Sequence, residues 1–200
     1  MVISMDNRLK QQMDFILEVD KIKNIGRQTY LSDGVRKEND AEHSWHLALM
    51  ALLLKEHATE EIDVMKVMTM VLVHDIVEID AGDTYAYDVE GYKTKEIREK
   101  AAAERIFGLL PTDQGEYLKE LWEEFEAYET SEAKYAHALD NFQPLMLNDA
   151  TDGRSWREHV VRKSQVLNRN RKTAEGSEVI MEQIRKMVDR NVEKGNLLDE

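Results

Sequence analysis

The sequence predicts a single all-α domain, a helical bundle, and three features support this class. Only two prolines and nine glycines interrupt 200 residues, and in most segments the apolar residues recur at the three- and four-residue spacing of amphipathic helices. No segment alternates apolar and polar residues with the period of two that marks a half-buried strand. The length suits one domain with a full-sized core, and no repeat or low-complexity tract divides it. We therefore expect one bundle over residues 1–200.

The first part of the chain is expected to form two helices separated by a polar loop. Four apolar residues with the spacing of one helix face mark the first helix: Leu9, Met13, Ile16 and Leu17. The polar stretch 24–39 contains Gly26 and Gly34 and is typical of a loop. Asp40 can then cap a second helix that runs to about His57.

The next helix is expected to occupy the centre of the bundle. Asp63 can cap it, and residues 64–78 are apolar nearly all round, as is typical of a buried helix. Ala81-Gly82-Asp83 ends this helix, and residues 84–94 read as a polar loop.

The second half of the chain contains the remaining predicted helices. One covers about 95–110 and stops at Pro111, and another opens at Thr112 and runs to about Tyr128. A further helix carries Asp140 and is expected to bend near Pro144.

Two more helix ends can be predicted near the C-terminus. Ser155 and Glu158 have the three-residue spacing of a capping box. Gly176 separates that helix from a last one over 177–194, and Gly195 is placed to end it.

Composition and net charge limit the kinds of partner that we expect the protein to bind and the compartment in which we expect it. The formal net charge is −13, so the chain should repel nucleic acid and anionic membranes. A small phosphorylated substrate is still compatible, because a metal ion can reverse the field locally. There is no cysteine, the first residues lack an apolar signal region, and the longest apolar run, 64–73, is too short to span a bilayer. We expect a cytoplasmic protein without nucleic-acid or membrane partners.

The residues suited to chemistry lie on three predicted helices. The central helix ends His74-Asp75-Ile76-Val77-Glu78, and polar groups on an apolar helix are costly unless they are paired or bound to metal. Residues three and four apart share a helix face, so His74, Asp75 and Glu78 can point into one cleft. His43 lies near the start of the preceding helix, and Asp140 lies on a later one.

Two imidazoles and two carboxylates suit one divalent ion such as Mn²⁺, Co²⁺, Fe²⁺, Ni²⁺ or Zn²⁺. An ion with four protein ligands keeps positions open for water and a phosphate oxygen, and Glu78 is near enough to act as general acid or base. A buried histidine is more often a hydrogen-bonded core residue than a ligand. The metal interpretation therefore rests on the combination of residues, and not on His43 or any other ligand alone.

These stretches resemble the HD-domain superfamily of metal-dependent phosphohydrolases, most closely the 5′-deoxynucleotidase branch that includes HD domain-containing protein 2. The similar segments are residues 35–44, 72–78, 81–83, 121–126, 131–134 and 139–140. The likeness covers about residues 8–150 and weakens over the C-terminal helices. The bare ligand pattern is moderately specific, and the Glu-x-x-x-Gly-Asp unit from Glu78 to Asp83 is more specific to the branch.

The resemblance implies a role for each matching residue. The metal ligands would be His43, His74, Asp75 and Asp140. Glu78 would protonate the leaving sugar oxygen or orient the attacking water, Asp83 would accept a hydrogen bond from the sugar 3′-hydroxyl, and Arg27 would bind the phosphate. A guanidinium suits a phosphate dianion in an acidic protein. The resemblance also implies a homodimer.

Two positions depart from the family pattern where the sugar would bind. Gln28 follows Arg27, where bacterial deoxynucleotidases carry a tryptophan, and Tyr30 can supply an aromatic ring instead. Tyr85 stands where the family often has a proline. These departures weaken the deoxyribose preference more than they weaken the reaction type.

Three functions are compatible with this pattern. The leading hypothesis is hydrolysis of a (deoxy)nucleoside 5′-monophosphate to nucleoside and phosphate. A second is an HD phosphohydrolase acting on another phosphomonoester or nucleotide. The third is a metal-stabilised binding protein without catalysis, whose ten methionines would serve partner surfaces. Glu78 and Asp83 argue against the third, since neither is needed to hold the metal.

Overall fold

The computed structural model describes residues 5–83 and 89–200 and confirms a helical protein. The first half contains α1 (Met5–Val19), the 3₁₀ turn η1 (Asp20–Asn24), α2 (Asp40–Leu53), the 3₁₀ turn η2 (Lys55–His57), α3 (Val64–Val73) and α4 (Glu78–Ala81). The second half contains α5 (Val89–Phe107), α6 (Thr112–Ala127), α7 (Ser131–Ala150), α8 (Arg154–Glu158), α9 (Lys163–Arg169), α10 (Thr173–Gly176) and α11 (Glu178–Glu193). A small sheet pairs β1 (Gly26–Tyr30) with β2 (Lys37–Asn39).

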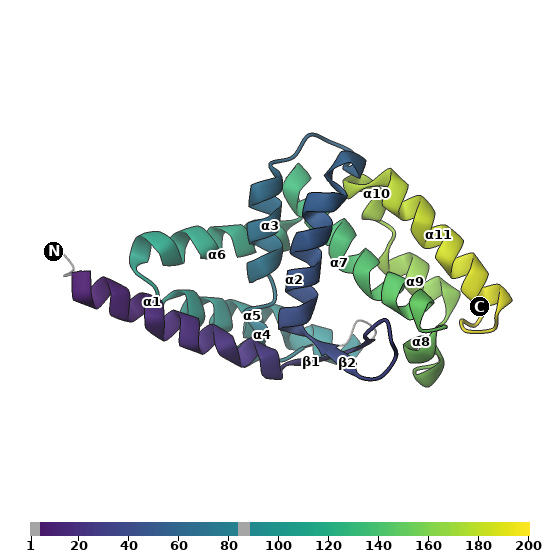
Figure 1. The fold of residues 1–200 in the computed structure, drawn as a ribbon, viewed down its shortest axis with the longest axis horizontal. Coiled ribbons are helices and arrows are strands. Elements are labelled where there is room, and N and C mark those ends of the chain that lie inside the picture. Colours follow the sequence, from purple (N-terminus) through teal and green to yellow (C-terminus); the bar gives the residue numbers. More distant parts are fainter. Residues whose placement is uncertain (1–4, 84–88) are drawn as a thin grey trace.

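Helix α7 organises the bundle because it packs against α2, α3, α6, α10 and α11. Figure 1 shows α2 and α3 side by side in the middle of the molecule, α1 and α6 at one end, and α9 and α11 at the other. The core lies between the middle helices, where Leu47, Met70, Tyr135 and Leu139 are fully buried. Within the described residues, no helix is long and apolar enough to cross a membrane.

The prediction that residues 24–39 form a loop is wrong, because this stretch contains both strands. They pair antiparallel, with Gly26 opposite Asn39 and Tyr30 opposite Lys37. Thr29 is the one buried residue of β1, so this strand has no alternating pattern for a sequence to reveal. Contacts of β1 with α7 and α8 hold the hairpin in place, and the hairpin carries Arg27.

The start of α2 differs from prediction by one residue. Asn39, and not Asp40, is the N-cap: its side chain accepts from the backbone N–H of Glu42, and the Glu42 side chain accepts from the backbone N–H of Asn39. This capping box frees Asp40 from the capping role. Asp40 is instead completely buried beneath the site.

The helix predicted over 64–78 ends early and is only partly buried. Asp63 caps it as predicted, accepting from the backbone N–H groups of Met65 and Lys66. The helix stops at Val73, because the chain tightens into i→i+3 hydrogen bonds before α4 begins at Glu78. Met65 and Leu72 remain exposed on its outer side, so the helix has the predicted central position but is not buried on every side.

The starts of three later helices can be compared with the starts predicted from the sequence. Helix α5 begins at Val89, so part of the loop predicted over 84–94 is helical; its packing against α4 outweighs the local effect of Gly91. The capping box predicted at Ser155 is wrong, since α8 starts after Gly153, whose φ of 67° turns the chain directly into the helix. Helix α11 begins one residue after the predicted start at 177, because Ser177 is its N-cap and accepts from the backbone N–H of Ile180.

Candidate metal centre and active-site cleft

Most of the site residues predicted from sequence line one cleft of about 420 Å³. They come from β1, from the turn between α3 and α4, from α4 itself, from the segment after α4 and from α7: Arg27, His74, Asp75, Glu78, Asp83 and Asp140. His43, in the first turn of α2, is fully buried behind the residues that line the cleft. Residues far apart in the sequence therefore meet at one place, where α2, α3 and α7 pack together.

The four predicted metal ligands converge at the back of the cleft. His43 Nε2 lies 3.0 Å from Asp140 Oδ1, and His74 Nε2 lies 3.1 Å from Asp75 Oδ1 and 3.8 Å from Asp140 Oδ1. Donor atoms of His43, His74 and Asp75 all lie within 4.8 Å of one another. These separations fit ligands that share one ion at bond lengths of about 2.0–2.2 Å.

The hydrogen bond made by His74 Nδ1 leaves Nε2 as the ring nitrogen that could bind a metal. His74 Nδ1 lies 2.8 Å from the carbonyl oxygen of Val71, so Nδ1 carries the proton and donates it. His74 Nε2 is buried and has no hydrogen-bond partner among the described residues. His74 Nε2 is thus directed at two carboxylates while Nδ1 is held by a carbonyl oxygen, an arrangement that suits a histidine sharing a divalent ion with acidic ligands, so the donor set fits the metal predicted from sequence.

His43 is oriented by a buried side-chain network that the sequence did not reveal. Its Nδ1 donates to Gln143 Oε1 at 3.0 Å, which directs Nε2 toward Asp140. Gln143 Nε2 in turn donates to Glu38 Oε2 at 2.8 Å. Gln143 and Glu38 are both buried, and no local sequence signal identifies either, because each acts through residues about a hundred positions away.

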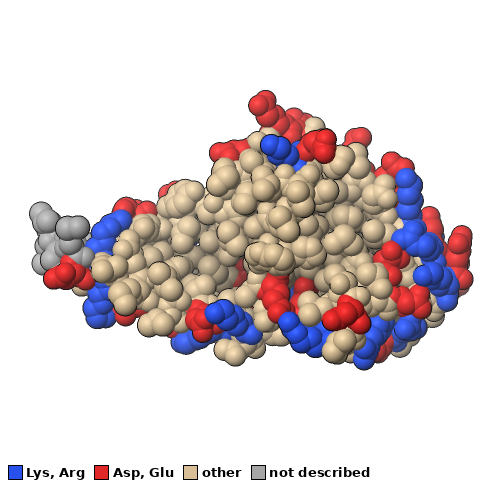
Figure 2. Space-filling view, in the orientation of Figure 1, with Lys and Arg blue, Asp and Glu red and all other residues tan. Residues whose placement is uncertain are grey.

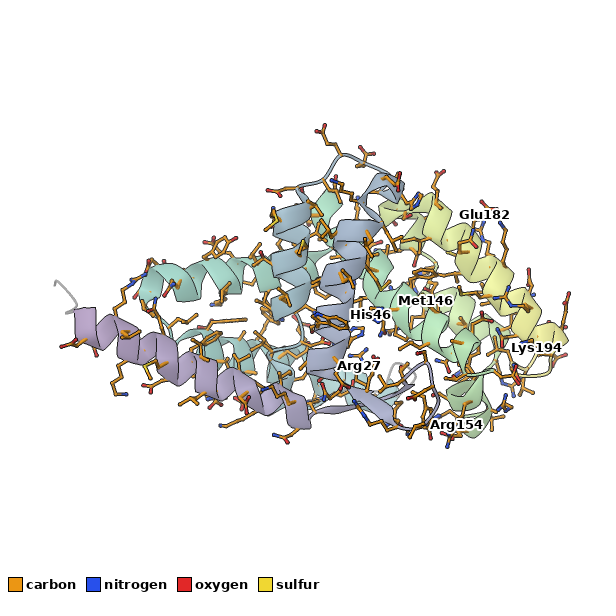
Figure 3. The ribbon with its side chains drawn as sticks, viewed as in Figure 1. Arg27, His46, Met146, Arg154, Glu182 and Lys194 are labelled. Carbon is orange, nitrogen blue, oxygen red and sulfur yellow. The ribbon has the colours of Figure 1, made fainter. Side chains whose placement is uncertain are left out.

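Arg27 lies near the start of α2 (Figure 3), where it lines the cleft and contacts three carboxylates. Its Nη1 donates to Asp75 Oδ2 at 3.0 Å and to Asp40 Oδ1 at 3.2 Å, and its Nε lies 3.4 Å from Glu38 Oε1. Burial opposes the charge, but the carboxylates of Asp75 and Asp40 raise the pKa of Arg27 above its ordinary value. A permanent positive charge is thereby held beside the predicted metal ligands.

Glu78 is buried, at 6% exposure, and one of its carboxyl oxygens has no hydrogen-bond partner among the described residues. Oxygens of Asp40, Asp75 and Glu78 lie within 4.8 Å of one another. Burial, together with the charges of Asp75 and Asp40, raises the pKa of Glu78 far above its ordinary value. A raised pKa favours the protonated carboxyl, which is the form that a general acid needs.

The residues predicted to contact the sugar are not all brought together. Asp83 lines the cleft just after Gly82, whose φ is 75°. Gln28 also lines it, and its side-chain oxygen accepts from Lys37 Nζ at 2.6 Å. Tyr30 is not among the cleft residues; its hydroxyl donates to the Glu158 carboxylate at 3.0 Å. Tyr85 lies outside the described residues.

An aromatic wall in the same cleft was not predicted from the sequence. Phe125 and His137 stack with their ring centroids 3.9 Å apart, and Tyr128 meets His137 edge-on at 5.0 Å. His137 Nε2 donates to the carbonyl oxygen of Phe125 at 2.9 Å, and burial lowers the pKa of His137. A neutral, flat surface of this kind suits a planar apolar group better than a phosphate.

Comparison with known proteins agrees with this geometry. The sequence matches the HD domain family over residues 19–181. It is 30% identical to human 5′-deoxynucleotidase HDDC2 over 135 residues, which cover 67% of this chain and 65% of the human protein. The bovine protein of the same name is 31% identical, over 67% of this chain and 64% of that protein. The chain thus spans just under two thirds of the length of these relatives.

Two solved structures share the fold. A predicted metal-dependent phosphohydrolase from Magnetospirillum magnetotacticum has a TM-score of 0.93 and 47% identity, covering 99% of this chain and all of the other. A conserved hypothetical protein from Pyrococcus furiosus has a TM-score of 0.59 and 26% identity, covering 86% of this chain and 99% of that protein. This chain belongs to the HD-domain family of metal-dependent phosphohydrolases.

Proposed function

We propose that this protein hydrolyses (deoxy)nucleoside 5′-monophosphates to nucleoside and inorganic phosphate. The observation that carries the proposal is one cleft in which a permanent cation, Arg27, and a buried carboxyl group, Glu78, lie beside the His43–His74–Asp75–Asp140 cluster. The relatives named 5′-deoxynucleotidase support the substrate class.

The back of the cleft would hold the metal. His43 and His74 would ligate through Nε2, and Asp75 and Asp140 through carboxylate oxygens. One divalent ion (Mn²⁺, Co²⁺, Fe²⁺, Ni²⁺ or Zn²⁺) would supply a Lewis acid that neutralises phosphoryl charge and lowers the pKa of a water nucleophile.

The chain's own groups then bind the substrate and move the proton. Arg27 presents two edges of its guanidinium to carboxylates, so it is pre-organised, and it would bind the phosphate oxygens. The Glu78 carboxyl would donate its proton to the 5′-oxygen of the leaving sugar. Asp83 would accept a hydrogen bond from the sugar 3′-hydroxyl.

Preference for deoxyribose is the finer part of the proposal. Gln28 lines the cleft next to Arg27 and would stand beside the sugar 2′ position. Tyr30, the other proposed contact, would have to leave Glu158 before its ring could reach the substrate. The aromatic wall of Phe125, Tyr128 and His137 would receive the base.

A substrate panel tests the proposal. The protein, loaded with Mn²⁺ or Co²⁺, would be given deoxynucleoside and ribonucleoside 5′-monophosphates, nucleoside triphosphates and a generic phosphomonoester, and released phosphate would be measured. We expect turnover of the 5′-monophosphates, fastest for deoxyribose. Faster hydrolysis of another ester would favour a different HD phosphohydrolase. Stoichiometric metal without any turnover would identify a binding protein and overturn the proposal.

Two predictions concern the protein as a whole, one from the resemblance and one from composition. A homodimer and a cytoplasmic location both belong to the proposal, and gel filtration with light scattering and localisation of a tagged protein would test them.

A further inference from the structure

One part of the cleft is lined by uncharged residues that the proposed function leaves unused. They come from β1, from the second half of α7 and from α8: Thr29, Pro144, Leu145, Asn148, Ser155 and Trp156. We call these six residues together the neutral arm. Helix α8 packs against both β1 and α7 (Figure 1), which brings the three elements together. Thr29, Asn148 and Ser155 are all buried, although polar side chains of these types are mostly exposed in proteins.

Asn148 gives the neutral arm a fixed hydrogen-bond acceptor. Its Nδ2 donates to the carbonyl oxygen of Pro144 at 3.0 Å, and because a carbonyl oxygen can only accept, this contact fixes the orientation of the amide. The other amide atom, Oδ1, is buried without a hydrogen-bond partner in the part of the chain that the structure describes. A buried acceptor without a donor costs free energy that a bound O–H or N–H group recovers.

Two hydroxyl groups extend this hydrogen-bonding surface. Thr29 and Ser155 lie in the same arm, and the hydroxyl of each forms no hydrogen bond with another residue of the ranges 5–83 and 89–200. A hydroxyl can both donate and accept. The arm therefore offers one acceptor and two groups of either kind to a ligand that enters the cleft.

The neutral arm and the aromatic wall extend from the predicted metal ligands in opposite directions. At 1.5 Å of rise per residue, Asn148 lies about 12 Å beyond Asp140 along α7, whereas His137 of the aromatic wall lies about 4.5 Å before it. Thr29 follows Arg27 by two residues on β1, so the arm also adjoins the residue proposed to bind the phosphate. The reacting phosphoryl group would thus lie between the two parts of the cleft.

This placement puts the neutral arm on the attacking side. In a displacement at phosphorus the entering and leaving oxygens stand roughly in line on opposite sides. The proposed function places the leaving nucleoside toward the aromatic wall, so the attacking oxygen would enter from the neutral arm. Water needs no more than the polar groups there. Trp156, Pro144 and Leu145 add an apolar surface, which suits the carbon skeleton of a larger molecule.

We propose that the neutral arm binds a neutral alcohol, either a sugar or a nucleoside, and that the protein transfers the phosphoryl group of its substrate to this alcohol in competition with water. The alcohol oxygen forms a bond to phosphorus while the bond from phosphorus to the 5′-oxygen breaks. The Glu78 proton goes to that 5′-oxygen, and the proton lost by the alcohol passes to solvent, from which Glu78 is protonated again. The products are a nucleoside and a new phosphomonoester.

The chemistry of the arm selects this class of acceptor. None of its six residues is charged, so a second phosphate or an ammonium group would find no counter-ion there. A hydroxyl compound can donate to Asn148 Oδ1 and exchange hydrogen bonds with Thr29 and Ser155. The inference rests on the proposed function, because the phosphoryl donor is the same nucleoside 5′-monophosphate.

Product analysis in the presence of an alcohol tests the proposal. The full chain, loaded with Mn²⁺, would be given a deoxynucleoside 5′-monophosphate together with D-ribose, a second nucleoside or glycerol. Phosphorus NMR would separate free phosphate from a new ester. We expect a new ester with ribose or the nucleoside, at a rate that saturates with alcohol concentration, and less with glycerol, which is too short to reach from phosphorus to Asn148.

The other outcomes separate this inference from the proposed function. Free phosphate without a new ester would overturn the inference and leave the proposed hydrolysis standing. A yield of ester that rises in proportion to alcohol concentration without saturating would show attack from bulk solvent and would also overturn the site. The absence of both products would overturn the proposed function and the inference with it.

Variants of the arm test its residues. In Asn148→Leu, which removes the fixed acceptor, the ratio of new ester to free phosphate should fall about tenfold, the effect of losing one hydrogen bond. This ratio does not depend on the total rate. Asn168→Leu, at an exposed asparagine of α9 outside the arm, is the matched control and should keep the wild-type ratio. If Asn148→Leu does not fold, Ser155→Ala should lower the ratio in the same direction, and an unchanged ratio would remove the arm from the reaction.

A binding measurement without turnover provides an independent test. Saturation-transfer NMR on the metal-free full chain would detect D-ribose, which has no base to occupy the aromatic wall. Wild type and Asn168→Leu should transfer saturation to ribose, and Asn148→Leu should transfer much less. Equal transfer by all three proteins, or none by the wild type, would contradict an alcohol site in the neutral arm.

Discussion

The cleft and the outer side of α2 and α3 are opposite in kind, although α2 carries both His43, which is buried behind the cleft, and the exposed Trp45. Figure 2 shows a broad uncharged area over α2 and α3. We call the exposed apolar residues of that outer side the apolar face: Trp45, Leu49, Leu52, Leu53, Met65 and Leu72. In the cleft, buried charged and polar groups crowd together: Arg27, Glu38, Asp40, His74 and Glu78 all contribute. On the apolar face, large apolar side chains meet solvent without a single charged residue between Trp45 and Leu53. Both arrangements are unfavourable for an isolated chain, and in both the unfavourable feature indicates what should bind there.

The difference lies in the number of partners that each group has inside the chain. Cleft residues are held by several contacts each, as when Arg27 meets Asp75, Asp40 and Glu38. Residues of the face, such as Trp45, have part of their surface covered by nothing among the described residues. Substitutions in the cleft should therefore change chemistry, whereas substitutions on the face should change assembly.

The largest effect is expected from removing a metal ligand. Asp140→Asn takes away the carboxylate that lies near both His43 and His74, so we expect loss of bound metal and a fall of activity to background. Metal content by atomic emission and phosphate release would be measured on the same sample. Asp189→Asn, at an exposed position of α11 outside the cleft, is the control for metal content, and full metal binding by Asp140→Asn would refute the ligand assignment.

Glu78→Gln should separate proton transfer from metal binding. Its carboxyl proton would be replaced by an amide of the same shape, so kcat should fall by about 10²–10⁴-fold with metal content unchanged. Asp80→Asn, two residues away and ion-paired with Arg105 on the surface, should retain full activity. Full turnover by Glu78→Gln would remove it from the mechanism.

A smaller effect is expected when the support of a ligand is removed. Gln143→Leu has nearly the same volume but cannot accept from His43 Nδ1 or donate to Glu38. Metal affinity should weaken by roughly 10–100-fold, as for other residues that orient a metal-binding histidine, with kcat largely restored at saturating metal. Competition with a chromogenic chelator would measure it. Unchanged affinity would show that packing alone orients His43.

The smallest effect is expected on the face, within one copy. Leu72→Ser should change the free energy of unfolding of one copy by less than about 0.5 kcal/mol, since Leu72 is half exposed. Leu47→Ala, at a fully buried position on α2, should cost about 2–5 kcal/mol. Urea unfolding would measure both. Similar losses of unfolding free energy in the two variants would mean that Leu72 is as well covered within one copy as Leu47. That result would contradict the difference that we draw between the cleft and the apolar face.

The sequence by itself determined the features that depend on neighbours a few residues away. The helical class follows from local spacing, and Asp63 and Ser177 cap helices because each side chain accepts from N–H groups two or three residues further along. The ligand candidates were also visible, because a histidine and acids on an apolar segment stand out against it. Capping and patterning are short-range, so a single chain is enough to detect them.

Only the tertiary structure decided which groups share an environment. Glu38 and Gln143 are 105 residues apart and meet because β2 and α7 pack around His43, and the hairpin that delivers Arg27 has no alternating pattern of its own. The apolar stripe of α1 and the outer side of α3 read as buried in the sequence, yet the bundle leaves both uncovered. Burial is a property of what packs against a residue, so hydrophobicity along one chain cannot distinguish its own core from a surface that awaits a partner.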